Sequence, residues 1–167
     1  MALPVFPVTE QVTSGTGAQS LILPTHEVGD FIFIYSCMNN NFGMVTPTSP
    51  NTWNRATTSD AGPGYTYLYY LQAVGSTLGN PTITPIVNGV TFQFLVVRGA
   101  SSVGTPTNAT SSTGNATAAA LTLTQDPQLV LSFVGGQVYG ENPFFAAGEM
   151  MEVKYLNFTN FGPRQGI

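Results

Sequence analysis

The chain is 167 residues long, and it combines 43% hydrophobic residues with only 7% charged residues and a net charge of −4. Soluble domains are on average about 25% charged. This composition excludes an intrinsically disordered chain, which needs low hydrophobicity and high net charge, and a nucleic-acid-binding protein, which needs a basic surface. The single cysteine excludes a disulfide scaffold. We expect residues 1–167 to form one domain with its own core.

The N-terminal segment, residues 1–7, predicts an extended apolar arm. The arm lacks a basic region followed by a long apolar stretch, so we expect no secretory signal. No later stretch approaches the roughly 18 consecutive apolar residues of a transmembrane helix. We therefore expect no association with a membrane.

Beyond the arm, short apolar or alternating runs recur between Gly, Pro, Asn and Ser residues, with almost no helical periodicity. This rhythm predicts an all-β fold: a single antiparallel β-sandwich, jelly-roll-like, with about 8–10 strands. A Ser/Thr/Gly/Asn-rich stretch predicts a long exposed loop at residues 101–117, and residues 159–167 predict an extended tail. The expected strands are residues 6–12, 19–23, 30–37, 52–58, 65–73, 82–86, 90–98, 118–124, 128–134 and 150–158.

Three of these strands show which faces they bury. In residues 65–71 the odd positions form one aromatic face, and in residues 90–98 the even positions 90, 92, 94 and 96 are Val or Phe, so each strand has an apolar side. We expect these two faces to pack against each other across a core about 10 Å thick. Residues 31–35 are apolar throughout, which is typical of a strand covered on both sides. Asn88-Gly89, between two strand-like runs, predicts a hairpin.

Groups capable of catalysis are few. His26 is the only imidazole, so any catalytic triad or Cys–His pair would have to use it. His26, Glu27 and Asp30 could gather a metal ion, but one imidazole and two carboxylates on a hairpin are more typical of a solvated loop. The carboxylates are scattered and include no obvious pair for glycoside hydrolysis. We expect no enzyme activity, no cofactor and no metal site.

Other residues have both a structural and a functional interpretation. Cys37 lies in an apolar run, where a small buried hydrophobe is more typical than a reactive thiol. Trp53 and the aromatic face of residues 65–69 fit a core, whereas exposed rings would suit stacking on a sugar. The polar tip at residues 39–43 is typical of a loop and could also be a contact site. For a glycan-binding chain, the expected contact residues are Trp53, Asn39 and Asn41.

The scarcity of charge points to partners. Free-standing domains keep about a quarter to a third of their surface charged, which 4 basic and 8 acidic residues cannot supply. Interface cores are depleted of charged residues. We therefore expect a stable homo-oligomer or a protomer of a larger shell, with these candidate interface residues in the arm, the tip and the tail: Leu3, Val5, Phe6, Asn40, Phe42, Phe158 and Phe161.

The order of several short motifs suggests a family. The motifs are residues 23–34, which contain Gly29-Asp30; residues 50–53 (Pro-Asn-Thr-Trp); the aromatic residues 67–73; residues 94–100, which contain Arg98-Gly99; and residues 126–131 (Asp-Pro-Gln-Leu-Val-Leu). In this succession the chain resembles a β-sandwich module of tailed-bacteriophage virion proteins, as in capsid decoration or cement proteins and tail fibres. The resemblance covers most of residues 21–134.

The resemblance implies a module without catalytic residues. With the stand-alone length, it leads us to expect a structural protein at the surface of the phage particle that decorates or cements the capsid. Its expected partners are its own copies, as a homotrimer, and the major capsid protein. The alternative is a tail-fibre or adhesin module that binds host-surface glycan, and a third hypothesis is a carbohydrate-acting enzyme.

Overall fold

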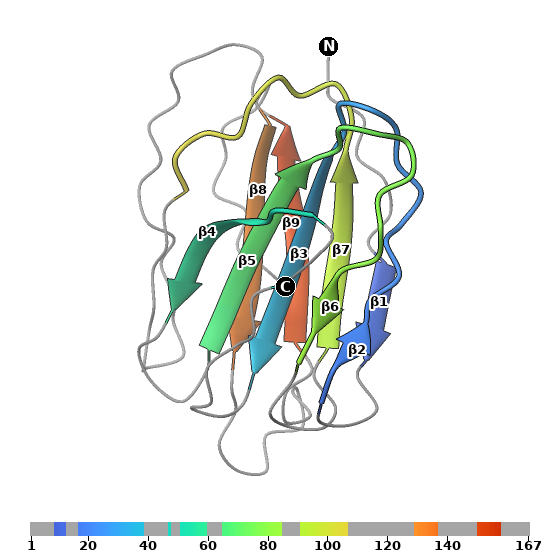
Figure 1. Ribbon diagram of the computed structural model, residues 1–167. Coiled ribbons are helices and arrows are strands. Elements are labelled where there is room, and N and C mark those ends of the chain that lie inside the picture. The colour runs from blue at the N-terminus through green and yellow to red at the C-terminus, as the bar shows by residue number, and fades with distance from the viewer. Residues whose placement is uncertain are drawn as a thin grey trace, which may run out of the picture.

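The computed structural model describes residues 9–12, 17–38, 47, 51–59, 65–84, 91–106, 129–136 and 150–157. Every regular element in these residues is a β-strand, and all strand pairs are antiparallel. For these residues, the prediction of an all-β fold is therefore confirmed. The strands, shown in Figure 1, are β1 (Thr9–Val12), β2 (Gln19–Ser20), β3 (Phe31–Met38), β4 (Asn54–Ser59), β5 (Tyr65–Gln72), β6 (Thr82–Ile83), β7 (Thr91–Val97), β8 (Leu129–Gly136) and β9 (Met150–Asn157).

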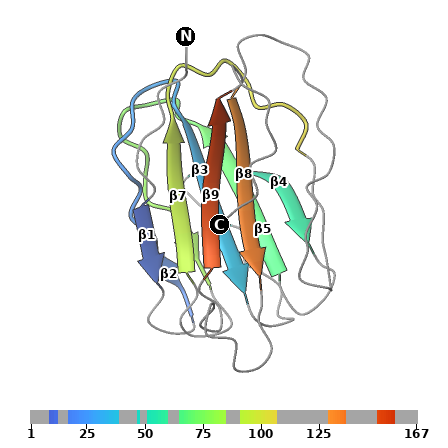
Figure 2. The same cartoon turned by 180° about the vertical axis from the view of Figure 1, so that it is seen from behind.

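The described strands form one large sheet and two small ones. The five-stranded sheet has the order β1-β7-β3-β5-β4, and the two-stranded sheets are β2-β6 and β8-β9. Seen from the two sides in Figures 1 and 2, β8-β9 lies behind the five-stranded sheet, against β3, and β2-β6 lies toward the other side. The large sheet is thus the middle layer of the described structure.

Strand β3 lies at the centre of this layer and is buried on both faces, as its sequence predicts. Ile32 and Ile34 belong to one hydrophobic cluster, the first cluster. Phe31, Phe33 and Tyr35 belong to a second cluster on the opposite face. All five side chains are buried. The alternation of side chains along a strand explains this split, because successive residues point to opposite faces.

The aromatic faces of β5 and β7 correct one expectation. Tyr67 and Tyr69 of β5 and Phe92 and Phe94 of β7 all belong to the first cluster. They do not face each other from two sheets, because β5 and β7 flank β3 in the same sheet, and Ile34 pairs with both Tyr69 and Phe94. The two faces therefore lie side by side, and Ile32 and Ile34 of β3 join them into one apolar surface.

The expected Asn88-Gly89 hairpin is also wrong in its pairing. Strand β6 pairs with β2, whereas β7 pairs with β1 and β3, so the strands on either side of this dipeptide lie in different sheets. Residues 85–90 lie outside the described residues. Strand β6 packs over the face of the large sheet instead of joining its edge, because Ile83 is buried in the first cluster.

The second expected strand, residues 19–23, keeps only its first two residues in a ladder. Beyond β2, the side-chain amide of Gln11 binds both backbone groups of Ile22, and its Oε1 accepts the Ile22 N–H at 2.8 Å. The Leu23 N–H donates to Asn80 Oδ1 at 3.0 Å. Side-chain amides therefore replace strand pairing here, while Leu21 remains buried in the first cluster. Residues 6–8 and 118–124, also expected as strands, lie outside the described residues.

We predict that Phe94→Ala lowers the free energy of unfolding by about 3–5 kcal/mol, because the ring is fully buried in the first cluster. Phe94→Leu keeps more of the volume and should lose less, about 1 kcal/mol. Urea unfolding followed by circular dichroism measures both. Ser101→Ala in the exposed loop after β7 is the control, with an expected change within about 0.5 kcal/mol. Equal losses in all three variants would contradict the assigned core.

Candidate functional site

Among the residues singled out for an interface or a glycan contact, the structure describes Trp53. The other positions lie outside the described residues: Leu3, Val5, Phe6, Asn39, Asn40, Asn41, Phe42, Phe158 and Phe161. Trp53 precedes β4, is 7% exposed and belongs to the first hydrophobic cluster. Tyr67 and Tyr69 are buried in the same cluster. These rings are part of the core and offer no exposed face on which a sugar could stack.

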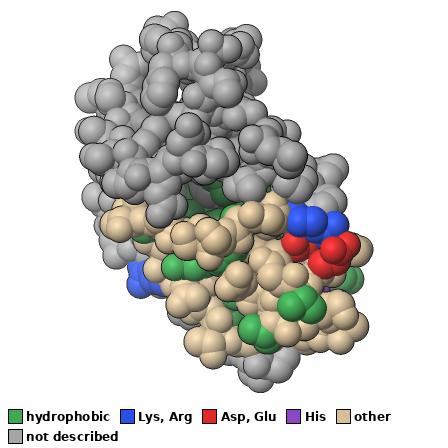
Figure 3. All heavy atoms as spheres, turned by 90° about the horizontal axis from the view of Figure 1, so that it is seen from above, with side chains coloured by type: hydrophobic (Ala, Val, Ile, Leu, Met, Phe, Trp, Pro, Cys, Tyr) green, Lys and Arg blue, Asp and Glu red, His purple; other side chains and the backbone are tan. Residues whose placement is uncertain are grey.

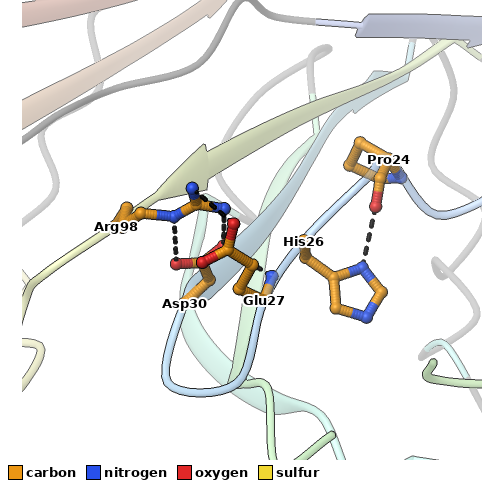
Figure 4. Close-up of polar contacts among 5 residues, drawn as sticks. All are labelled: Pro24, His26, Glu27, Asp30 and Arg98. Carbon is orange, nitrogen blue, oxygen red and sulfur yellow. Dashed lines mark hydrogen bonds and ion pairs between the residues drawn. The ribbon is translucent and has the colours of Figure 1, made fainter. Parts of the chain in front are cut away.

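Oppositely charged side chains of the described residues meet at one end of the large sheet. Asp30 directly precedes β3 and Arg98 directly follows β7, and the pairing of Phe31 with Val97 places the two residues next to each other. The guanidinium binds the carboxylate through two parallel contacts, from Nε to Oδ1 at 3.1 Å and from Nη2 to Oδ2 at 3.1 Å (Figure 4). This two-pronged geometry suits an arginine and a carboxylate particularly well.

The same carboxylate closes the turn before β3. Its Oδ2 accepts the N–H of Glu27 at 2.8 Å, and the N–H of Asp30 donates to the Glu27 carbonyl at 3.1 Å. Between them, Gly29 has a φ of +91°, a conformation that favours glycine because it has no Cβ. The turn is tied to the end of β5 by Ala73, whose carbonyl accepts the Gly29 N–H at 2.7 Å and whose N–H donates to the Asp30 carbonyl at 2.8 Å.

Burial and charge act in opposite directions on Asp30, which is 1% exposed. Burial by itself would raise the pKa of the carboxyl, but the Arg98 hydrogen bonds, the Glu27 N–H and the guanidinium charge outweigh it and hold the pKa below its ordinary value of 3.8. The same hydrogen bonds raise the pKa of Arg98. Arg98 also contacts the Glu27 carboxylate at 2.8 Å from Nη1 to Oε1, at the solvent-facing side of the cluster.

His26 lies beside this cluster and connects two loops. Its Nδ1 lies 2.8 Å from the carbonyl of Pro24, and its Nε2 accepts the N–H of Leu78 at 3.4 Å. The three side chains considered for a metal site, His26, Glu27 and Asp30, are therefore all engaged in contacts within the chain. Within the described ranges, no group of three or more His, Cys, Asp or Glu residues is arranged to hold a metal ion.

The end of the sheet that carries the ion pair also exposes aliphatic side chains. Val28 and Val74 are 67% and 86% exposed, although both are adjacent to the tightly bonded Gly29 and Ala73. Figure 3 looks down on this end, where basic and acidic side chains lie together at one edge and hydrophobic side chains interrupt the polar surface nearby. This surface was not among the predicted sites, because single valines beside a turn carry no signal in the sequence.

Comparisons with known proteins add no relative: no family model matches the chain, and neither a curated protein nor a solved structure matches it significantly. In the part of the chain that the structure describes, there is no helix with the length and apolar character needed to cross a bilayer. The functional interpretation therefore depends on two features of the structure, the ion-paired turn and the exposed valines beside it.

We predict that Asp30→Asn lowers the free energy of unfolding by about 2 kcal/mol, because a buried carboxylate loses its charge-assisted bonds. Glu27→Gln is the matched control, since it changes the other carboxylate on the same guanidinium, whose side chain is 66% exposed. Its expected change is within about 0.5 kcal/mol. Urea unfolding at pH 7 measures both, and a larger loss for Glu27→Gln would show that the exposed contact is the more important one.

The pH dependence follows from the lowered pKa of Asp30. A carboxyl whose pKa is lower in the folded protein stabilises the fold above its ordinary value, and this contribution is lost as the pH falls through the folded value. The difference in urea midpoint between the wild-type chain and Asp30→Asn should therefore stay constant from pH 7 to about 5 and shrink below the ordinary value of 3.8. A difference that remains constant down to acid unfolding would contradict the assignment.

Proposed function

We propose that this chain is a structural protein of a tailed-phage particle, a capsid decoration or cement protein that stabilises the head by contacts between copies and with the major capsid protein. The observation that carries the proposal is the meeting of three motifs from the resemblance at one corner. Gly29-Asp30, Ala73 and Arg98 come from separate segments and are joined there by an ion pair and backbone hydrogen bonds. This corner supports the interpretation of the motif succession as a single physical unit.

The proposed architecture is a jelly-roll-like β-sandwich. Two findings support it: the large sheet has a hydrophobic cluster on each face, and Leu131 of β8 packs against the second cluster. The contacts of β8 and β9 with β3 are consistent with a second layer on that side of the sheet. A sandwich of this kind suits a protein that works as a rigid block, because its core is independent of the surfaces that meet partners.

The proposed mechanism is burial of surface and requires no catalysis. The chain has 4 basic and 8 acidic residues, and three of these, Glu27, Asp30 and Arg98, are bound to one another in the corner cluster. The surface therefore offers mainly neutral polar and apolar groups to a partner, as is typical of interface cores. A homo-oligomer on the particle surface, which we propose to be a trimer, would cover part of this surface.

The alternative, a tail-fibre or adhesin module that binds host glycan, loses one of its supports. Trp53 is buried in the first cluster, whereas aromatic sugar platforms need an exposed ring face. We therefore favour the capsid over the fibre.

We predict that purified particles of the phage that encodes this chain contain it in a copy number comparable to that of the major capsid protein. Quantitative mass spectrometry against labelled peptides of both proteins measures the ratio, and a tail protein of the same particle serves as the low-copy control. A ratio like that of the tail protein would favour the fibre alternative. The absence of the chain from purified particles would overturn the proposal altogether.

A further inference from the structure

We propose that the end of the large sheet that carries Val28 and Val74, with Glu27 and Arg98 at its edge, is the surface through which copies of this chain contact one another. This inference rests on the proposed function, because it identifies the contact that builds the proposed homo-oligomer. It goes beyond the arm, the tip and the tail, which the sequence alone suggests as interface segments.

The apolar part of the surface is compact. Three large hydrophobic side chains are strongly exposed among the described residues, and two of them, Val28 and Val74, lie at this end. They are on neighbouring segments, because the adjacent Gly29 and Ala73 are joined by a hydrogen bond of 2.7 Å. Two exposed aliphatic side chains on neighbouring segments of a charge-poor protein are best accommodated in a contact that removes them from water.

The charged part of the surface identifies the occupant. Glu27 and Arg98 lie side by side, and their side chains are 66% and 33% exposed. A surface that offers an acid and a base next to each other is complementary to a rotated copy of itself, since the carboxylate of one copy can meet the guanidinium of the next. A partner of one sign of charge would be attracted by one group and repelled by the other. The pairing of both signs beside an apolar centre therefore favours a second copy.

The surface is also held in one conformation before any contact. Asp30 anchors the turn to Arg98, and Ala73 binds the turn through both of its backbone groups. His26 joins the preceding loop to Leu78. A preorganised surface loses little conformational freedom on association, so a small number of contacts can suffice.

The test compares three variants of the full-length chain by sedimentation velocity over a range of concentrations. Val28→Ser/Val74→Ser should raise the dissociation constant of the oligomer at least about 10-fold. Glu27→Lys should weaken association by a similar factor, and more at low salt, because its ammonium group would face Arg98 of the second copy across the contact. Ile22→Ser is the matched control, because Ile22 is 67% exposed, as Val28 is. Ile22 lies far from Arg98: its backbone is hydrogen-bonded to Gln11, and Gln11 pairs with Phe92 near the start of β7, whereas Arg98 follows the end of β7. The control variant should associate like the wild-type chain.

The outcomes separate this inference from the proposed function. Emission from the buried Trp53 reports whether each variant is folded, and only folded variants are compared. An oligomer that tolerates Val28→Ser/Val74→Ser and Glu27→Lys would overturn the assignment of the surface and leave the virion proposal in place. Dissociation by Ile22→Ser to the same degree would also overturn it. A wild-type chain that stays monomeric overturns the self-contact, whereas the copy number in particles tests the virion role independently.

Discussion

The ion pair between Asp30 and Arg98 is the constraint on which the order of the large sheet depends. It joins the residue before β3 to the residue after β7, directly beside the paired residues Phe31 and Val97. A slip of β7 by one residue would turn Phe94 from the first cluster to the opposite face. The same slip would separate the guanidinium from the carboxylate. Hydrophobic pattern and ion pair thus specify the same register, which is the best-attested use of a buried charge.

This arrangement gives the scarcity of charge a structural meaning. Asp30 is buried and directs its carboxylate at Arg98 and at the backbone of its own turn, so its charge organises the chain and contributes little to the surface. The exposed surface nearby consists of Val28, Val74 and the Glu27–Arg98 pair. In most domains exposed charges keep neighbouring molecules apart. Here part of a small set of charges is engaged internally, and the exposed end remains open to contact.

The sequence predicts the strands well but not how distant strands combine. Period-two alternation locates β5 and β7, and a continuous apolar run locates β3, each to within a residue or two, because burial of one face imposes alternation and burial of both faces removes it. The same pattern does not indicate which strands share a sheet, and by itself it favours opposed faces for β5 and β7. A turn dipeptide such as Asn88-Gly89 indicates a change of direction, not the partner of the next strand. Asp30 and Arg98 are 68 residues apart, and no local rule predicts that they meet.

The corner cluster also explains why exposed valines can persist in this position. A turn without the Asp30 carboxylate would leave the N–H of Glu27 without its acceptor, and the turn could then rearrange to bury Val28 against its own chain. The ion pair and the two bonds of Ala73 remove that freedom. The valine is therefore held away from the core by bonds formed within the fold, and the proposed contact between copies would cover it. A rigid end that cannot bury its own apolar groups is a physical basis for assembly.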